Sequence, residues 1–477
     1  MNLASLFPGQ ALPATVNVTG LTADSRKVRP GFLFAALKGV AADGRDFIPQ
    51  ALANGAVGVI GHDLPDLGEA VAIDVEEPRL ALATASAAFY ARQPETVVAV
   101  TGTNGKSSTV DFLRQIWECA GLTAASMGTL GAIGPKGHID LGHTTPDPVA
   151  IHETLAKLAD QGVTHCAMEA SSHGLVQYRL DAVKLAACAF TNLTQDHLDY
   201  HKDMDDYRAA KLRLFSELMP AGAPAVVNAD SPERGAFEAA AKARGLRVVS
   251  VGWRGEDLKI SELMPRATGQ TLFLKWRREE VEVDLPLIGE FQALNALTAA
   301  GLALSLGAPL AAVCEGMSKL KPVKGRLEFV GETEQGAGVF VDYAHTPDGL
   351  DVLIRAARPH TAGKLVVIFG CGGDRDRKKR PLMGEIAARQ ADRVIVTDDN
   401  PRSEDPASIR SAILDAAPDA VEIADRGEAI RQAVSELGEG DTLLIAGKGH
   451  ETGQIIGNTV IPFSDQDTAK AALEARR

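Results

Sequence analysis

The residues best suited to chemistry lie in the segment TGTNGKSST, residues 101–109. The apolar run 97–100 predicts a strand before it, and apolar residues at helical spacing over 110–120 predict a helix after it. Glycines in such a turn let backbone N–H groups converge on phosphate oxygens, and the helix N-terminus adds positive potential. Lys106 can reach nucleotide phosphates, and a following hydroxyl can bind Mg²⁺. Gly102 is the only upstream glycine of this segment, so the loop is shorter than usual, and an ordinary Gly-rich turn is the alternative.

Two polar clusters follow the next predicted strands, at 163–168 and 185–190. Glu169 begins the first cluster, and His197 lies in the second, which spans 192–201. Open α/β sheets bind ligands at the carboxyl ends of their strands, so both side chains could face the phosphate loop. Carboxylate oxygens suit Mg²⁺, and one histidine is tolerable. Helix-capping loops are the alternative interpretation.

Lys211 interrupts an apolar helical stripe. Spacing places it on one face with Tyr207, Leu214 and Leu218. A buried amine needs a partner or a lowered pKa, and a neutral amine can take up CO₂ as a carbamate. The alternative is a lysine that extends from the edge of the stripe into solvent.

The last third of the chain alternates strands and helices. Strands are predicted at 339–342, 364–369, 393–397 and 442–446, with helices around 350–357, 381–389, 409–416 and 428–437. This alternation predicts a doubly wound sheet. Its strand ends carry Arg375, Asp399 with Arg402, and Glu451, which suit a zwitterionic substrate. Surface salt bridges are the alternative.

Composition limits the class of protein. The 477 residues predict two to four domains, and 45% hydrophobic with 23% charged residues is the balance of a soluble protein. A formal charge of −13 argues against nonspecific nucleic-acid binding. The stretch 299–314 is too short and too weakly apolar to span a bilayer. Five cysteines without a CxxC pair predict reduced thiols in a cytoplasmic protein.

Taken together, the motifs resemble those of the Mur ligase family over essentially the whole chain. TGTNGKSST, MEASSHGL, TNLTQDHLDYH, the Lys211 segment, VDYAHTPDGL, FGCGGDRD, DNPR and GKGHE occur in the family's order. The DNPR element resembles the form that accepts meso-diaminopimelate rather than lysine. Two positions differ from the family's usual pattern: His143 stands where Asn is expected, and Ser107-Ser108 replaces threonines.

The resemblance implies an α/β fold of three domains. Residues 1–92 would bind UDP-MurNAc, residues 93–325 would form a central, mostly parallel P-loop ATPase-type sheet, and residues 326–477 would form a Rossmann-like, doubly wound amino-acid-binding domain. The implied reaction is ATP-dependent addition of meso-diaminopimelate to UDP-MurNAc-L-Ala-D-Glu through an acyl phosphate, in peptidoglycan precursor synthesis. We expect a monomer with no nucleic-acid or membrane partner.

The resemblance also implies site residues by matching motif positions. The catalytic set is Lys106, Lys211 and His197. ATP would be bound by Gly102, Thr103, Asn104, Gly105, Lys106, Ser107, Ser108, Asn295, Arg326 and His345. The UDP-MurNAc-dipeptide would be bound by Ser25, Val40, Ala41, Ala42, Thr144, Thr145, Ser171, Gln177 and Arg179. Diaminopimelate would be bound by Arg375, Asp399, Asn400, Pro401, Arg402, Gly447 and Glu451. Mg²⁺ would be held by Ser107, Glu169, His197 and Lys211, the last as an N6-carboxylysine.

Two other functions stay open on the sequence. One is another ligase of the Mur or folylpolyglutamate type, including a lysine-adding one, against which the DNPR loop argues. The other is a nonenzymatic P-loop nucleotide switch, which would need no second-substrate loops.

Overall fold

The computed structural model describes residues 1–39, 42–194 and 200–476. It divides into two compact units, one of Met1–Leu258 with Leu297–Gly316 and one of Lys259–Ala296 with Met317–Arg477. The dividing positions fall within β13 (Leu258–Arg266), α9 (Glu290–Ser305) and α10 (Leu310–Ser318). Among the described residues, no helix is long and apolar enough to cross a bilayer.

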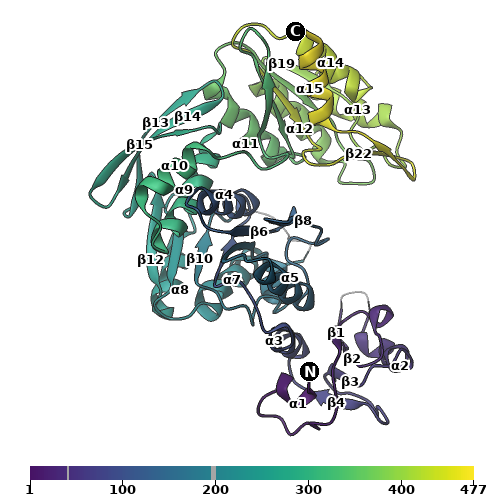
Figure 1. Ribbon diagram of the computed structural model, residues 1–477. Helices are drawn as coiled ribbons and strands as arrows, with labels where there is room; N and C mark the ends of the chain where they lie inside the picture. The colour runs from purple at the N-terminus through teal and green to yellow at the C-terminus, as the bar shows by residue number, and fades with distance from the viewer. Residues whose placement is uncertain (40–41, 195–199, 477) are drawn as a thin grey trace. The chain divides into compact units, whose positions relative to one another are not determined.

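The chain begins with a small parallel sheet, shown in purple and blue in Figure 1. β1 (Gly20–Thr22), β2 (Phe32–Ala35), β3 (Gly58–Gly61) and β4 (Val71–Asp74) lie in chain order. Successive residues of β2 face opposite sides: Leu33 and Ala35 pack in one apolar cluster and Phe34 in another. The helices α1 (Leu3–Leu6) and α3 (Pro78–Tyr90) contribute to the first cluster, and α2 (Ile48–Ala53) contributes to the second. These residues therefore form a small α/β fold with an apolar cluster on each face of the sheet.

A larger sheet follows in the first unit, in the order β12-β11-β10-β5-β9-β6-β7-β8. Its strands from β12 to β6 are parallel, and β7 and β8 return antiparallel. The strand bounds are β5 (Thr96–Thr101), β6 (Ala124–Gly128), β7 (Gly131–Gly134), β8 (Gly137–Ile139), β9 (His165–Glu169), β10 (Ala187–Phe190), β11 (Pro224–Asn228) and β12 (Arg247–Gly252). The strands predicted at 97–100, 163–168 and 185–190 are β5, β9 and β10. Because β5 lies between β9 and β10, the carboxyl ends of these three strands meet.

Helices cover this sheet. Their bounds are α4 (Lys106–Cys119), α5 (Pro148–Asp160), α6 (Ser172–Val176), α7 (Met204–Arg213) and α8 (Arg234–Arg244). Helix α7 begins at the capping residue Asp203, whose carboxylate accepts from Asp206 N at 2.9 Å, and it continues into a π-helical turn, Leu214–Leu218. Residues of α5, α7 and α8 share one apolar cluster with the strands, which fixes where α7 presents its buried face.

The second unit contains the predicted doubly wound sheet. Its strands lie in the order β16-β17-β21-β18-β19-β20, parallel except for β16. Their bounds are β16 (Glu328–Glu332), β17 (Gly338–Asp342), β18 (Leu365–Phe369), β19 (Arg393–Val396), β20 (Val421–Glu422) and β21 (Thr442–Ala446). One face packs against α11 (Pro347–Ala357), α12 (Lys379–Gln390) and α13 (Pro406–Leu414), and the other against α14 (Arg426–Glu436) and α15 (Asp465–Arg476). The predicted strands and helices of this region are confirmed.

Two antiparallel hairpins complete the second unit. They are formed by β14 (Gly269–Trp276) with β15 (Glu279–Leu285) and by β22 (Gly453–Ile456) with β23 (Thr459–Pro462). The second hairpin is joined to the loop after β19 by a β-bridge between Arg402 and Ile456. This contact bears on the geometry of that loop, as described below.

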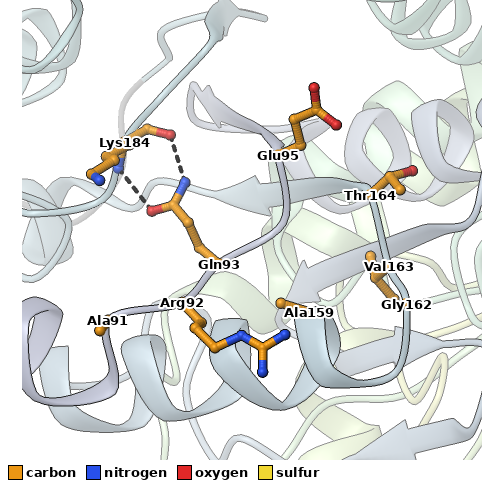
Figure 2. Close-up of a pocket in the computed structure, with 9 residues that line it drawn as sticks. All are labelled: Ala91, Arg92, Gln93, Glu95, Ala159, Gly162, Val163, Thr164 and Lys184. Carbon is orange, nitrogen blue, oxygen red and sulfur yellow. Dashed lines mark hydrogen bonds between the residues drawn. The ribbon is translucent and has the colours of Figure 1, made fainter.

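Gln93 lies between α3 and β5. Gln93 Nε2 donates to Lys184 O at 2.9 Å and Gln93 Oε1 accepts from Lys184 N at 3.1 Å, as Figure 2 shows. A hollow of about 440 Å³ lies beside this contact, lined by residues that include Arg92, Glu95 and Thr164. It lies at the amino ends of β5 and β9, away from the phosphate loop, and contains none of the predicted site residues. The residue boundaries of the three domains stay a prediction.

Candidate active site

The glycine loop lies between β5 and α4, as the sequence predicts. Gly102 has a φ of +149°, and a Cβ there would lie 1.9 Å from Thr191 Oγ1, so no side chain fits at this position. Thr191 Oγ1 donates to Asn104 O at 2.6 Å, and Asn104 N donates to Asn192 Oδ1 at 3.0 Å. Thr191 and Asn192 follow β10, the neighbour of β5. The carboxyl end of β10 therefore holds the loop in place.

Two lysine ammonium groups meet one carbonyl oxygen of this loop. Lys106 Nζ donates to Gly102 O at 2.9 Å and to Thr103 O at 2.7 Å. Lys211 Nζ donates to the same Gly102 O at 2.8 Å. The N-terminus of α4 adds further positive potential. This charge suits anionic phosphate groups.

Lys211 is 1% exposed, and its Nζ lies 4.3 Å from the centroid of the Tyr207 ring. The alternative interpretation, in which the amine extends into solvent, is therefore wrong. The Tyr207 hydroxyl lies 3.2 Å from Thr103 Oγ1, so the helix that carries Lys211 also contacts the loop. The predicted stripe is buried at Leu214 as well.

Glu169 ends β9 and is 2% exposed. Its Oε1 accepts from Ser107 Oγ at 2.8 Å and from Thr129 N at 2.8 Å. A Cβ at Gly128 would lie 2.1 Å from the same oxygen, so the turn after β6 closes tightly over the carboxylate. The arrangement brings a carboxylate and a hydroxyl together beside the phosphate loop, which is a pair of hard oxygen donors.

Five of the residues predicted for the muramoyl-dipeptide form a connected cluster next to Glu169. Thr145 Oγ1 donates to Glu169 O at 3.0 Å and accepts from Ser171 N at 3.1 Å. Arg179 donates to Thr145 O, and its Nη2 donates to Gln177 Oε1 at 2.8 Å. Thr144 is joined to the cluster through Thr129, because their hydroxyl oxygens lie 3.0 Å apart. His143 is exposed.

Several predicted positions stand apart from this cluster. Ser25 is buried within the β1–β4 part, where its Oγ donates to Gln50 Oε1 at 2.7 Å. Ala42 is exposed, and its carbonyl accepts from Gly39 N at 2.9 Å. Val40, Ala41 and His197 lie outside the described residues. Among the described side chains, no group of three or more His, Cys, Asp or Glu residues could hold a metal ion by itself.

In the second unit, the predicted diaminopimelate residues follow β18, β19 and β21. Asn400 Nδ2 donates to Glu451 Oε2 at 3.0 Å, which joins the loops after β19 and β21. A Cβ at Gly447 would lie 2.6 Å from Asp399 Oδ2, so the chain passes closely beside that carboxylate. Burial raises the pKa of Asp399, and the nearby Arg426 and Lys448 oppose this rise. Pro401 is buried beside Asn400.

Arg402 adopts a φ of +51°, which is uncommon for a residue with a side chain. The β22–β23 hairpin holds it there: Arg402 N donates to Ile455 O at 3.0 Å, and Gly457 N donates to Arg402 O at 2.7 Å. Arg402 Nη1 donates to Gly373 O at 2.8 Å. Arg375 is exposed nearby in sequence, with its Nη1 donating to Asp374 O at 3.1 Å. A constrained backbone of this kind is common where a side chain must be aimed.

The remaining residues predicted for ATP also lie in the second unit. Asn295 Nδ2 donates to Gln292 Oε1 at 3.3 Å, and Gln292 Nε2 donates to Arg326 O at 3.1 Å. The Arg326 guanidinium lies 4.8 Å from the centroid of the Tyr343 ring, and Tyr343 O accepts from His345 Nδ1 at 2.8 Å. Burial lowers the pKa of His345, which favours the neutral ring. The structure thus brings Arg326 and His345 together around Tyr343.

Sequence reasoning missed Thr129, Asn192 and Lys448 as individual site residues. Thr129 follows β6, whose sequence Ala-Ala-Ser-Met-Gly is too weakly apolar to signal a strand. Asn192 opens the polar cluster 192–201, and no local pattern distinguishes it from the other members of that cluster. Lys448 lies within GKGHE, two residues beyond the apolar run 442–446, and this position after a buried strand is the signal that could have found it.

Comparison with known proteins identifies the class. Residues 17–101 match the Mur ligase family catalytic domain, residues 100–303 the Mur ligase middle domain, and residues 325–449 the Mur ligase glutamate ligase domain. The chain belongs to the Mur ligase family, as its motifs indicate.

Among its relatives is the UDP-N-acetylmuramoyl-L-alanyl-D-glutamate--2,6-diaminopimelate ligase of Brucella melitensis, 53% identical over 474 residues, which cover 99% of this chain and 96% of the relative. A solved structure of a ligase with the same description is 32% identical, with a TM-score of 0.78 and coverage of 100% of this chain and 99% of that one. The fold also resembles MurF ligase from Thermotoga maritima in complex with ADP, with a TM-score of 0.64, 19% identity and coverage of 97% and 99%. The predicted α/β fold of the Mur ligases is confirmed.

Proposed function

We propose that this chain is an ATP-dependent amide ligase that adds meso-diaminopimelate to UDP-N-acetylmuramoyl-L-alanyl-D-glutamate in peptidoglycan precursor synthesis. The observation that carries the proposal is the convergence of Lys106, Lys211 and Glu169 on the glycine loop. A nucleotide switch needs such a loop as well, but it needs no loop like 399–402 with its charged surroundings. The predicted domains at 1–92, 93–325 and 326–477 are part of this proposal, binding UDP-MurNAc, ATP and the amino acid respectively.

The proposed reaction has two steps. A γ-carboxylate oxygen of the D-glutamyl residue attacks the γ-phosphorus of ATP, the bond to the bridging oxygen of ADP breaks, and an acyl phosphate forms. The amine of diaminopimelate then attacks the acyl carbon and loses a proton, and phosphate leaves with the former carboxylate oxygen. Phosphoryl transfer needs charge stabilisation and alignment more than covalent help from the protein.

The residues of the first unit would perform the first step. Lys106 supplies positive charge at the β- and γ-phosphates, and the loop backbone holds them. Thr145, Ser171 and Arg179 hold the dipeptide next to that loop. For ATP, the proposed binding residues are 102–108 with Asn295, Arg326 and His345. For the muramoyl-dipeptide, they are Ser25, Val40, Ala41, Ala42, Thr144, Thr145, Ser171, Gln177 and Arg179.

The donors beside the loop fit Mg²⁺. Ser107 Oγ and Glu169 Oε1 are in contact at 2.8 Å and are hard oxygen ligands. We propose that they hold the ion with His197 and a modified Lys211. When bound, Mg²⁺ would neutralise negative charge on the phosphates.

The second unit would bind the amino acid. We propose that Arg375, Asp399, Asn400, Pro401, Arg402, Gly447 and Glu451 form its site. Guanidinium groups pair with carboxylates and carboxylates with ammonium groups. Diaminopimelate carries a second carboxylate that lysine lacks, and the constrained Arg402 is the residue we assign to it.

We expect Lys106→Ala to lower the rate of ligation at least ~100-fold, because charge stabilisation at the transferred phosphate is lost. The measurement is phosphate release with saturating substrates, after thermal melting has shown that the variant folds. Lys136→Ala is the matched control, since Lys136 is exposed. Near-normal turnover by folded Lys106→Ala would remove the phosphate-loop assignment.

The amino-acid assignment predicts strong discrimination. The wild-type protein should release phosphate with UDP-MurNAc-L-Ala-D-Glu and meso-diaminopimelate but reject L-lysine. Lysine leaves the Arg402 guanidinium without its carboxylate, at a cost of about 2–3 kcal/mol, which corresponds to a kcat/KM that is roughly 30- to 150-fold lower for lysine. Arg402→Ala should lose diaminopimelate activity with little change in the KM for ATP. The exposed Arg355→Ala, in the same unit, is the control. Equal use of the two amino acids by the wild type would contradict the assignment and leave the ligase proposal standing.

The electrostatics around Gly102 predict a modified Lys211. Two ammonium groups at one buried carbonyl oxygen repel each other, and carbamylation of Lys211 would replace one cation by an anion. The neutral amine attacks CO₂, a C–N bond forms and a proton is released. ¹³C NMR with labelled bicarbonate should show a protein carbamate signal that is absent from Lys211→Ala.

Variants separate this modification from a structural role. Lys211→Ala should be nearly inactive though folded, with partial rescue by acetate, and Lys211→Arg should also fail because a guanidinium cannot form the carbamate. Lys242→Ala, at an exposed helical lysine, should leave both the activity and the carbamate signal unchanged. Full activity of Lys211→Arg, or turnover without a carbamate signal, would contradict the carbamylation of Lys211.

A further inference from the structure

Lys448 is a fully buried lysine between the loops that follow β19 and β21. It is 0% exposed, and a buried ammonium group is costly unless hydrogen-bonded partners surround it. Its Nζ donates to Asn400 Oδ1 at 2.9 Å and to Glu451 Oε2 at 3.1 Å, and it lies 4.0 Å from Asp399 Oδ1. Each of these three partners belongs to the proposed amino-acid site, whereas Lys448 itself presents no surface to solvent.

The hydrogen bonds of Asn400 show what Lys448 does to the site. Asn400 Oδ1 accepts from Lys448 Nζ and from Ile455 N, both at 2.9 Å, so both lone pairs of this oxygen are used. Asn400 Nδ2 donates one hydrogen to Glu451 Oε2 at 3.0 Å. The amide therefore has a single orientation, and its second N–H has no partner among the residues that the structure describes. Glu451 Oε1 likewise accepts no hydrogen bond from them, and the Glu451 side chain is 35% exposed.

The charges around Lys448 add a second effect. Asp399 and Glu451 are carboxylates on neighbouring loops, and two such groups repel when nothing lies between them. Arg426 also acts on Asp399, where it opposes the rise in pKa that burial causes, but its guanidinium donates two hydrogen bonds of 2.7 Å to Asp465 and none to the Asp399 or Glu451 carboxylates. Lys448 is the cation in contact with Glu451 and Asn400 among the residues that the structure describes. Without it, the two carboxylates would separate and the Asn400 amide could rotate.

We infer that Lys448 is a positioning residue for the amino-acid substrate: its ammonium group fixes the Asn400 amide and holds Glu451 beside Asp399, so that one N–H donor and two carboxylates face the substrate's charged groups. This rests on the proposed function, which places diaminopimelate at Asn400 and Glu451. Lys448 does not touch the substrate. It acts through residues that do.

Lys448→Met tests the inference, because methionine keeps most of the volume and removes the charge. With ATP and the UDP-dipeptide saturating, the KM for meso-diaminopimelate should rise at least ~30-fold, as expected for loss of one partner of a buried charge pair. The KM for ATP should stay within about twofold, since general loosening of the fold would affect both substrates. Lys364→Met is the matched control, at an exposed lysine of the same unit. An unchanged KM for diaminopimelate, or equal rises in both KM values, overturns the inference.

Lys448→Arg provides a second variant if the methionine protein does not fold. A guanidinium keeps the charge and can donate to both partners, but from a different position. We expect a smaller rise in the KM for diaminopimelate and no rise in the KM for ATP. An unchanged KM for diaminopimelate, or an equal rise in both KM values, overturns the inference. If the wild type releases no phosphate with meso-diaminopimelate, the proposed substrate is wrong, and the same comparison of KM values is made with the amino acid that the wild type does accept.

Discussion

The candidate active site depends on one carbonyl oxygen that accepts from two lysines. Gly102 O receives Lys106 Nζ at 2.9 Å and Lys211 Nζ at 2.8 Å, although the two side chains come from different helices. Gly102 itself is held against Thr191 at the end of β10, where a Cβ would not fit. Two cations beside one carbonyl oxygen repel each other, so binding of an anionic phosphate or carboxylate oxygen beside the loop is favoured.

The parallel sheet explains why the other groups gather at the same place. β5 lies between β9 and β10, so the glycine loop, Glu169 and Asn192 are neighbours by topology alone. Glu169 then links the loop, through Ser107, to the turn at Thr129 and the cluster around Thr145. A shift of β9 by one residue would turn Glu169 to the opposite face of the sheet.

The loops of the second unit carry charges of both signs. Asp399 and Glu451, beside Lys448, suit an ammonium group, and the guanidinium groups of Arg375 and Arg402 suit carboxylates. The first unit therefore favours anionic oxygens, and the second favours a zwitterion that carries an amine. An amide ligase that activates a carboxylate by phosphorylation needs both kinds of site.

The sequence predicts the glycine loop and the strands β5, β9, β10, β17, β18, β19 and β21 because these have strong local signals. Alternating strand and helix patterns located β17, β18, β19 and β21, and the break in an apolar stripe marked Lys211 as unusual. The partners of these residues could not be predicted in the same way. Thr129 reaches Glu169 because β6 and β9 are neighbours in the sheet. Lys448 reaches Asn400 from the loop after β21, although β18 lies between β21 and β19. No local sequence pattern records either arrangement. The positive φ of Arg402 likewise depends on a hairpin that follows it by more than fifty residues.

The central claim is that the site activates a carboxylate by phosphorylating it, and an isotope experiment tests this most directly. UDP-MurNAc-L-Ala-D-Glu labelled with ¹⁸O in the γ-carboxylate is incubated with ATP, meso-diaminopimelate and the protein, and the released phosphate is analysed by mass spectrometry. An acyl phosphate predicts that each phosphate carries one ¹⁸O atom from the carboxylate and that the new amide keeps the other. Ligation that releases unlabelled phosphate would contradict the account.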